Sequence, residues 1–284
     1  LGRCRLGRFD SGVPPVGPMA NMTRLFMEKL PFFLIVIGFS VLAVAAQDSM
    51  GAVGSIAEYP LSLRLANAVN SAGIYLFKMI WPHDMAVFYP YYNQIPTGQL
   101  VSSLALLGGI SLLCLHQFRQ RPYLLIGWFW FLGTLVPVSG LVQVGSHSMA
   151  DRYTYIPLIG IFIMIAWSIS ELSAGWRYQQ EVFGSAACGI ILLLMIVAWT
   201  QVQYWDNSIS LFQQAIKATP HNFLAHYNLG NLLLNQGRGE EAIQHYQEAL
   251  KIKPNHAKAM NNMGLILQSR GEIAGARQLF ARAL

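Results

Sequence analysis

The chain has 284 residues, of which 54% are hydrophobic and only 11% are charged, and its mean hydropathy is +0.40. This composition is too apolar and too poor in charge for an ordinary soluble domain, so that class is excluded. The net charge of +6 comes partly from basic residues ahead of the first apolar run, which indicates membrane topology rather than nucleic-acid binding.

Residues 1–29 are predicted to form a cytoplasmic N-terminal loop, because Pro14, Pro15 and Pro18 follow a basic stretch and no signal-peptide arrangement is present. The chain begins with Leu1 rather than methionine, and it stops inside a repeat. We therefore expect it to be a fragment that lacks both ends of a longer protein.

Residues 30–201 are predicted to form a transmembrane block, because five apolar runs approach the roughly 20 residues that cross a bilayer as a helix. We expect each run to be a spanning helix. The runs cover residues 30–46, 98–115, 123–141, 155–170 and 183–201. The expected fold class is all-α: a polytopic helical bundle followed by an α-solenoid.

Residues 61–81 are long enough to span, but their polar residues follow one helical face and favour a helix lying in the membrane interface. These residues are Arg64, Asn67, Asn70, Ser71 and Lys78. If this segment does not cross, the basic N-terminus and the turn at 116–121 both lie in the cytoplasm, as an excess of Lys and Arg requires. The predicted outer segments are then 47–96 and 142–154, an inner loop lies near 176–181, and the repeats emerge outside.

Residues 202–284 contain an internal repeat whose period, about 34 residues, is that of tetratricopeptide repeats. The pairs one period apart are Gly230 and Gly264, Ala242 and Ala276, Tyr246 and Phe280, and Ala249 and Ala283. The small residues let paired helices approach closely, and the aromatic residue fills the space between them. We expect a capping half repeat at 204–222, a repeat at 223–256 and an incomplete repeat at 257–284.

Asn228 and Asn262 are also one repeat period apart and belong to the first helices of their repeats, which face the concave groove. An asparagine side chain can both donate to and accept from a peptide backbone. The functional interpretation is a ladder that holds an extended peptide, similar to the superhelix of O-GlcNAc transferase. The alternative is that asparagine is simply common at this position of the repeat.

The predicted outer segment at 142–154 contains a polar cluster with His147, Asp151, Arg152 and Tyr153. Arg152 could bind a lipid-linked phosphate while Asp151 fixes its geometry, because a guanidinium group matches phosphate and carboxylate oxygens. The alternative is an interfacial salt bridge flanked by the tyrosines of an aromatic belt.

His83 and Asp84 in the other outer segment could join the same surface. Together with His147 and Asp151 they lack any recognised ligand spacing, so we expect no metal. Cys4, Cys114 and Cys188 are widely separated, which excludes a disulfide framework. No glycine-rich phosphate loop, Ser-His-Asp order or zinc helix is present, and no nucleic-acid partner is expected.

Several stretches followed by repeats resemble bacterial relatives of the transmembrane and tetratricopeptide-repeat-containing O-mannosyltransferases. They are Glu28–Pro31, Arg64–Asn67, Trp81–Pro82, Ala86–Pro90, Arg121–Tyr123, Gly127–Pro137, Gly140–Gln143 and Ala150–Pro157. The resemblance implies the GT-C glycosyltransferase architecture, a polyprenyl-phosphate-linked sugar as donor, and a protein acceptor handled by the repeats. It also implies a bacterial inner membrane rather than the endoplasmic reticulum, with the repeats on the non-cytoplasmic side.

That family places its catalytic acidic residues in a first outer loop near the N-terminus, for which this chain has no counterpart. We therefore expect the catalytic residues to be absent and the fragment to be inactive alone. The competing hypothesis is a non-catalytic, membrane-anchored repeat scaffold for protein interactions, although several helices with polar outer loops suggest more than an anchor.

Overall fold

The computed structural model describes residues 18–49, 59–91, 95–141 and 147–284. Within these ranges the chain forms eleven α-helices, two very short strands and two 3₁₀ turns, so the all-α class is confirmed. The chain divides into two compact units, Leu1–Val53 and Gly54–Leu284.

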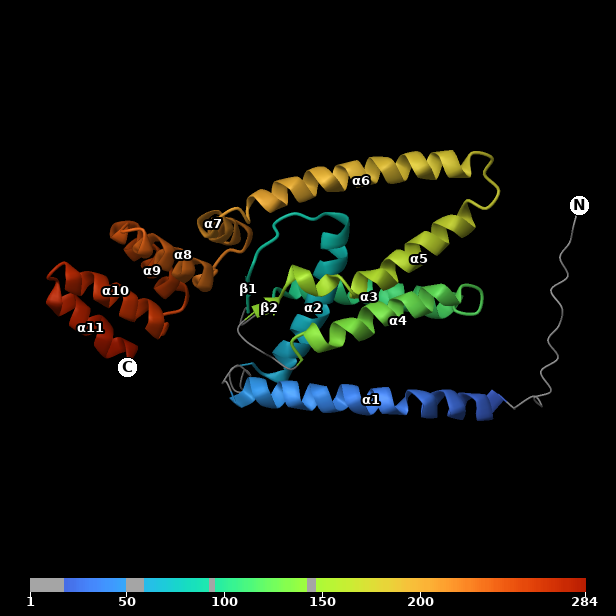
Figure 1. The fold of residues 1–284 in the computed structure, drawn as a ribbon, viewed down its shortest axis with the longest axis horizontal. Coiled ribbons are helices and arrows are strands. Elements are labelled where there is room, and N and C mark those ends of the chain that lie inside the picture. The colour runs from blue at the N-terminus through green and yellow to red at the C-terminus, as the bar shows by residue number, and fades with distance from the viewer. Residues whose placement is uncertain (1–17, 50–58, 92–94, 142–146) are drawn as a thin grey trace, which may run out of the picture. The chain divides into compact units, whose positions relative to one another are not determined.

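The first unit contains one long helix, α1, which spans Pro18–Ser49 (Figure 1). The loop predicted for residues 1–29 is therefore wrong from Pro18 onward, while residues 1–17 lie outside the described ranges. Proline is compatible with the first turn of a helix, and the methionine, glutamate, lysine and leucine residues that follow are good helix formers. Pro31 lies inside the helix, as membrane helices tolerate.

The second unit begins with five helices, of which the first contains the polar stripe at residues 61–81 and the other four follow apolar runs of the sequence. They are α2 (Leu61–Ile80), α3 (Thr97–Gln117), α4 (Pro122–Leu135), α5 (Pro157–Leu172) and α6 (Gln179–Gln203). Proline starts both α4 and α5, where its fixed φ suits the first helical position. Pro137 ends α4 earlier than expected, and the chain continues there as a 3₁₀ turn, Val136–Val138.

Two helices of the described chain, α3 and α6, are long and apolar enough to cross a membrane. By contrast, α4 has 14 residues and α5 has 16. At 1.5 Å per residue these helices extend about 21 and 24 Å, less than the roughly 30 Å of a hydrocarbon core. The five spanning helices expected from the sequence therefore stay a prediction.

Helices α2 to α5 share one apolar core, in which Trp128, Phe131 and Tyr75 are almost completely buried. The indole of Trp128 donates to the hydroxyl of Ser111 on α3 at 2.9 Å, so its polar atom is satisfied inside the core. Helices α4 and α5 approach most closely at a pair of glycines, Gly127 and Gly160. Small residues at such crossings are typical of helices packed in membranes.

Replacing Gly127 with leucine should destabilise the α4–α5 pair. A Cβ at this position would collide with the carbonyl oxygen of Gly160 and lie 2.5 Å from the side chain of Met164. Overpacking of this kind costs about 1–3 kcal/mol, which a thermal melt of the detergent-solubilised chain would detect. Gly133→Leu on the same helix is the matched control, because nothing lies within 4 Å of its Cβ position. Equal melting temperatures for the two variants would contradict this packing.

The polar stripe of α2 faces the protein rather than a membrane surface. The guanidinium of Arg64 donates to the carbonyl oxygens of Tyr59 and Leu141, at 2.7 and 3.2 Å. The amide of Asn67 donates to the carbonyl oxygen of Ser148 at 2.8 Å. The polar side chains thus bind backbone carbonyls in and next to the two predicted outer segments. Contacts inside the protein, rather than the membrane interface that we expected, account for the polar face of α2. Helix α2 also runs steeply across the direction of α6 (Figure 1).

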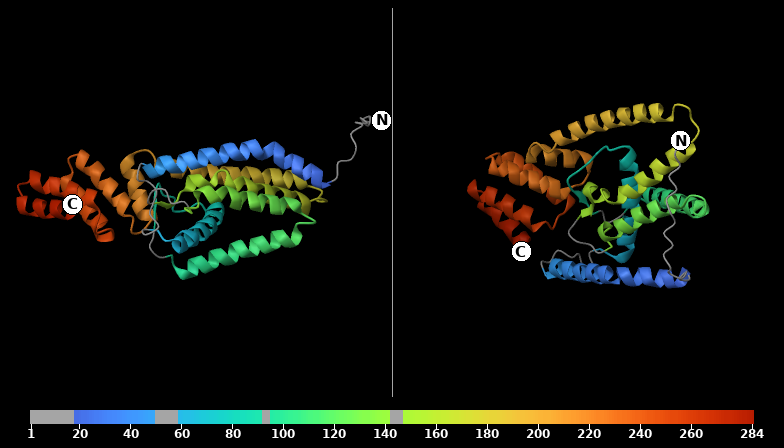
Figure 2. Two further views of the ribbon diagram at one scale, coloured as in Figure 1. Left: turned by 90° about the horizontal axis from the view of Figure 1, so that it is seen from below. Right: turned by 45° about the vertical axis from the view of Figure 1, so that its right-hand side comes forward.

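The C-terminal part of the second unit is an array of antiparallel helices (Figure 2). They are α7 (Ser208–Ala218), α8 (Phe223–Asn235), α9 (Gly239–Ile252), α10 (Ala257–Ser269) and α11 (Ile273–Ala283). Their order is that of the predicted half repeat, repeat and partial repeat. Only the turn between Gln203 and Ser208 separates this array from α6.

Glycines allow the repeat helices to pack at the predicted positions. A Cβ on Gly230 would lie 2.7 Å from the ring of Tyr246, and one on Gly264 would lie 2.7 Å from the ring of Phe280. Gly237, which follows α8, has a φ of +77°, a conformation that only glycine adopts without strain. The periodic pattern of the sequence therefore corresponds to direct helix contacts.

Candidate functional site

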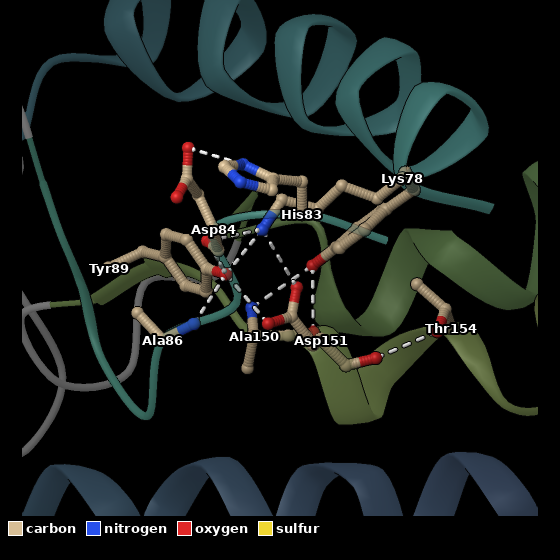
Figure 3. Close-up of polar contacts among 9 residues, drawn as sticks. Lys78, His83, Asp84, Ala86, Tyr89, Ala150, Asp151 and Thr154 are labelled. Carbon is tan, nitrogen blue, oxygen red and sulfur yellow. Dashed lines mark hydrogen bonds and ion pairs between the residues drawn. The ribbon is translucent and has the colours of Figure 1, made fainter. Parts of the chain in front are cut away.

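A two-stranded antiparallel pairing joins the two predicted outer segments. Strand β1 is Tyr89–Pro90 and strand β2 is His147–Met149, with Tyr89 opposite Met149. The pairing brings the end of α2 beside the 3₁₀ turn Asp151–Thr154. Residues from distant parts of the sequence thus meet at one site (Figure 3).

The carboxylate of Asp151 is the centre of this site. One oxygen lies 3.4 Å from the ammonium of Lys78, and the other accepts the hydroxyl proton of Tyr89 at 2.6 Å. The Lys78 side chain is 13% exposed and that of Asp151 24%, so the ion pair is largely shielded from solvent. Burial and the adjacent carboxylate raise the pKa of Tyr89 above its ordinary value, which keeps its hydroxyl a donor.

The loop between Lys78 and Tyr89 is folded onto this ion pair. The ammonium of Lys78 also donates to the carbonyl oxygen of Asp84 at 3.1 Å, and the amide of Ala86 donates to the hydroxyl of Tyr89 at 2.9 Å. Asp84 has a φ of +52°, the left-handed conformation that aspartate tolerates better than most residues. In this backbone conformation the carbonyl oxygen of Asp84 lies next to the ammonium of Lys78 (Figure 3).

Tyr75 of α2 holds the residue that precedes Asp151. Its hydroxyl accepts from the amide of Ala150 at 3.1 Å and donates to the carbonyl of the same residue at 3.2 Å. Tyr75 is 2% exposed, and its ring belongs to the core of α2 to α5. The 3₁₀ turn containing Asp151 and Arg152 is thus attached directly to the helical core.

Asp151 has a charged partner among the described residues, whereas Arg152 has none. Its guanidinium lies 5.3 Å from the ring centre of Tyr153, and it forms no ion pair with any residue that the structure describes. The expectation that Asp151 fixes the geometry of Arg152 is not met, because the carboxylate contacts Lys78 and Tyr89 instead. A cation that is exposed and uncompensated is suited to an anion.

His147 lies beside the same turn. Its Nε2 atom is 3.0 Å from the hydroxyl of Tyr153. Burial lowers the pKa of His147 below its ordinary value, and the nearby charge of Arg152 lowers it further. A neutral imidazole at physiological pH follows, so the positive charge of the turn belongs to Arg152.

His83 and Asp84 form an exposed pair at the rim of the site, with Nδ1 of the imidazole 2.8 Å from a carboxylate oxygen. Asp84 reaches the centre of the site through its backbone carbonyl, not through its carboxylate. Among the described residues, no group of three or more His, Cys, Asp and Glu side chains could hold a metal ion.

A cavity of about 260 Å³ opens beside the turn. Asp151 and Arg152 line it together with Gln201, Trp205 and Gln214, which belong to the junction between α6 and α7. Arg152 therefore borders a space that also contacts the segment leading into the repeats.

Asn222 attaches the repeats to the outer segment. Its amide nitrogen donates to the carbonyl of Phe88 at 3.1 Å and to the hydroxyl of Thr219 at 2.8 Å. Its oxygen accepts from the amide of Ala225 at 2.9 Å and caps α8. With 1% of its surface exposed, Asn222 links the first helix of the complete repeat to the residue preceding β1.

The two asparagines predicted to hold a peptide differ in their surroundings. Asn262 lines a groove of about 470 Å³ together with Tyr227, Lys258 and Asn261. Its amide donates to the side chain of Asn231, in the preceding repeat, at 2.8 Å. Asn228 is half-buried on α8 and is not part of the groove lining. The peptide ladder formed by the two asparagines stays a prediction.

Sequence reasoning did not identify Lys78, Tyr89 or Asn222 as members of the site. Lys78 was visible as the last residue of the polar stripe on α2, and a lysine in an apolar helix signals an internal partner. Asn222 stands one repeat period before His256, and both cap the first helix of a repeat. Tyr89 carried no comparable signal.

The tetratricopeptide repeats are confirmed by two family models. One tetratricopeptide-repeat model matches residues 223–256 and a second matches residues 245–278. The first match has the same boundaries as the repeat predicted from the sequence period. The C-terminal part of the chain is therefore a tetratricopeptide-repeat region.

Curated relatives of the chain are protein O-mannosyl-transferases. The chain is 33% identical over 141 residues to TMTC1 of Mus musculus, an alignment covering 48% of this chain and 15% of the relative. It is likewise 33% identical to TMTC1 of Homo sapiens, covering 48% and 16%, and 27% identical to human TMTC4, covering 47% and 18%. The matched region is thus less than a fifth of each relative's length.

Among solved structures, the crystal structure of MamA is 29% identical and covers 26% of this chain and 44% of that chain, with a TM-score of 0.26. A point mutant of MamA is 23% identical and covers 43% and 94%, also with a TM-score of 0.26. At these scores the likeness does not bear on the arrangement of the whole chain.

Proposed function

We propose that this chain is part of a membrane glycosyltransferase-like protein that transfers a sugar from a polyprenyl-phosphate donor to a protein acceptor. The site contributes the group that binds the donor phosphate, and the repeats bind the acceptor. The names of the relatives support sugar transfer and mannose as the sugar. The observation that carries the proposal is the uncompensated guanidinium of Arg152 at the cavity beside Asp151.

Arg152 is suited to a phosphate because a guanidinium forms two parallel charge-assisted hydrogen bonds with anionic oxygens. During transfer, negative charge develops on the departing lipid phosphate, and a cation fixed nearby stabilises it. The Lys78–Asp151 pair and Tyr75 hold the turn that presents Arg152. Asp151 itself is an ion-paired, hydrogen-bonded carboxylate, so we propose that it positions the turn that presents Arg152. The base that activates the acceptor hydroxyl must be a different residue.

The acceptor side of the proposal rests on the position of the repeats. Asn222 fastens the first complete repeat to the residue before β1, and the junction of α6 and α7 forms a wall of the cavity. An acceptor polypeptide held by the repeats would therefore lie near the donor phosphate. This arrangement supplies proximity, which raises the effective concentration of the acceptor.

Transfer from a lipid-linked donor requires a membrane location. We propose that α3 and α6 cross a bacterial inner membrane, that the shorter α4 and α5 and the apolar run in α1 complete five spans, and that the repeats lie on the non-cytoplasmic side. No described residue of α6 is buried, and its exposed surface is apolar. This surface supports contact with lipid.

This topology predicts opposite accessibility for the two ends of α6. In a variant whose three native cysteines are replaced by serine, Asp206→Cys should react with an impermeant maleimide from outside spheroplasts. Arg177→Cys should react only after the membrane is permeabilised. Both positions are exposed on the protein, so membrane side alone decides the outcome. Labelling of both from the same side would contradict a crossing α6.

A non-catalytic scaffold is the second candidate, and it is favoured by the matches of the repeat models alone. A scaffold would bind proteins through the groove at Asn262 but would transfer no sugar. Incorporation of labelled mannose into protein by membranes that contain the complete reading frame separates the two functions.

A further inference from the structure

A second cavity, of about 250 Å³, follows the polar stripe of α2. Asn67, Asn70, Ser71 and Lys78 all line it, and they lie along one helical face. Residues from β2, the start of α3 and the end of α7 complete the walls. The polar stripe therefore forms one side of a partly open cavity, whose other walls include the apolar side chains of Ile74, Ile95 and Met149.

Two mostly buried residues that line this cavity have hydrogen-bonding groups that no described residue binds. Asn70 is 8% exposed and Ser71 is 3% exposed. The oxygen of Asn70 accepts from Ser103 at 3.4 Å, whereas its amide nitrogen and the hydroxyl of Ser71 have no partner among the described residues. Both groups keep access to solvent in the cavity, because the hydroxyl of Tyr91 is the only fully enclosed polar side-chain atom without a partner in the described part of the chain. Water or a ligand can therefore bind them.

The charge of the cavity favours a neutral ligand. The ammonium of Lys78 is compensated by Asp151, and the carboxylate of Asp84 contacts the imidazole of His83 at the exposed rim (Figure 3). The remaining polar lining consists of amides and hydroxyls, including Gln99. Such groups both donate and accept, as the hydroxyl groups of a sugar do. A phosphate would find no uncompensated cation among the described residues here, in contrast to the cavity at Arg152.

We infer that this cavity binds a single sugar ring through Asn70, Ser71 and Gln99. Its volume of about 250 Å³ accommodates one hexose ring. Lys78 lines this cavity and its partner Asp151 lines the cavity at Arg152, so the ion pair lies between the sugar site and the phosphate site. The choice of a sugar among hydroxyl-rich ligands rests on the proposed transferase function.

The test is saturation-transfer difference NMR with methyl mannoside, using the whole chain in nanodiscs. We expect sugar signals with the wild-type chain and at least a fivefold loss with the double variant Asn70→Leu, Ser71→Ala, which removes the polar groups at nearly constant volume. Gln120→Leu, at an exposed position that lines neither cavity, is the control and should leave the signals unchanged. Equal thermal melting of the three proteins establishes that the variants are folded.

Unchanged signals in the folded double variant, or no sugar signal with the wild-type chain, would overturn the assignment. The sugar ring can belong to the donor or to a glycosylated acceptor. Competition by mannose 1-phosphate indicates the donor, and competition by mannosyl-threonine indicates the acceptor. Competition by neither compound also overturns the assignment. Because binding is measured without a lipid donor, its result is separate from that of a transfer assay. If the protein transfers sugar but the double variant still binds it, only the assignment of the sugar to this cavity is refuted. If the wild-type protein binds sugar in this cavity but transfers none, only the transferase function is refuted.

Discussion

Asp151→Ala should be among the most damaging single substitutions in the second unit. It leaves the shielded ammonium of Lys78 without its carboxylate and removes the closer of two acceptors of the Tyr89 hydroxyl, the other being the carbonyl of Asp84 at 3.3 Å. Breaking a buried ion pair costs about 3–5 kcal/mol, and the partial exposure of Asp151 places the effect near 3 kcal/mol. For a protein of this size that is a fall of about 6–12 °C in the melting temperature.

Two further variants isolate the ion pair as the cause. Adding Lys78→Met to Asp151→Ala should restore part of the lost stability, because the unpaired ammonium is removed. Asp84→Asn should have little effect, since asparagine also accepts the left-handed backbone and the lost pair with His83 is exposed. A double variant less stable than Asp151→Ala would show that the stabilisation does not come from the Lys78–Asp151 contact.

Arg152→Ala should weaken the binding of polyprenyl phosphate by about 10- to 150-fold. The reason is the loss of charge-assisted hydrogen bonds, which contribute about 1.5–3 kcal/mol. Arg152→Lys should retain part of the affinity, because an ammonium keeps the charge but not the forked geometry. The dissociation constants would be measured by isothermal titration of the chain in nanodiscs with a short-chain polyprenyl phosphate.

Arg177→Ala is the matched control for this experiment, because Arg177 is also an exposed arginine that stacks on the following tyrosine. It lies at the opposite end of α6 from the site. An equal loss of affinity in both variants would point to general attraction of anionic lipid by surface charge. Unchanged affinity in Arg152→Ala would remove Arg152 from the donor site.

The repeats could be predicted from the sequence because their contacts are periodic. The contact between Gly230 and Tyr246 recurs one repeat later between Gly264 and Phe280, so the pattern is visible without a structure. The helix positions of the apolar block could be predicted from hydropathy for a similar reason. Their ends shifted where proline decides the local conformation, as at Pro137 and Pro157.

The site could be predicted only in part, because its contacts are long-range. The polar loop with Asp151 and Arg152 was recognisable, but the partner of Asp151 is Lys78, 73 positions away. Only the pairing of β1 with β2, two strands too short to show an alternating pattern, brings these residues together. The polar stripe of α2 was also visible, yet amphipathicity alone does not tell whether a polar face meets lipid headgroups, protein or a cavity.

The central claim is that Arg152 belongs to the donor site of a sugar transferase. The most direct measurement is the transfer of radiolabelled mannose from polyprenyl phosphate to protein, by membranes that contain the chain in its complete reading frame. The wild-type protein should incorporate label, Arg152→Ala should reduce the rate by at least tenfold at equal expression, and Arg177→Ala should match the wild type. Incorporation that is unaffected by Arg152→Ala, or its absence from wild-type membranes in which the repeats still bind protein, would contradict the claim.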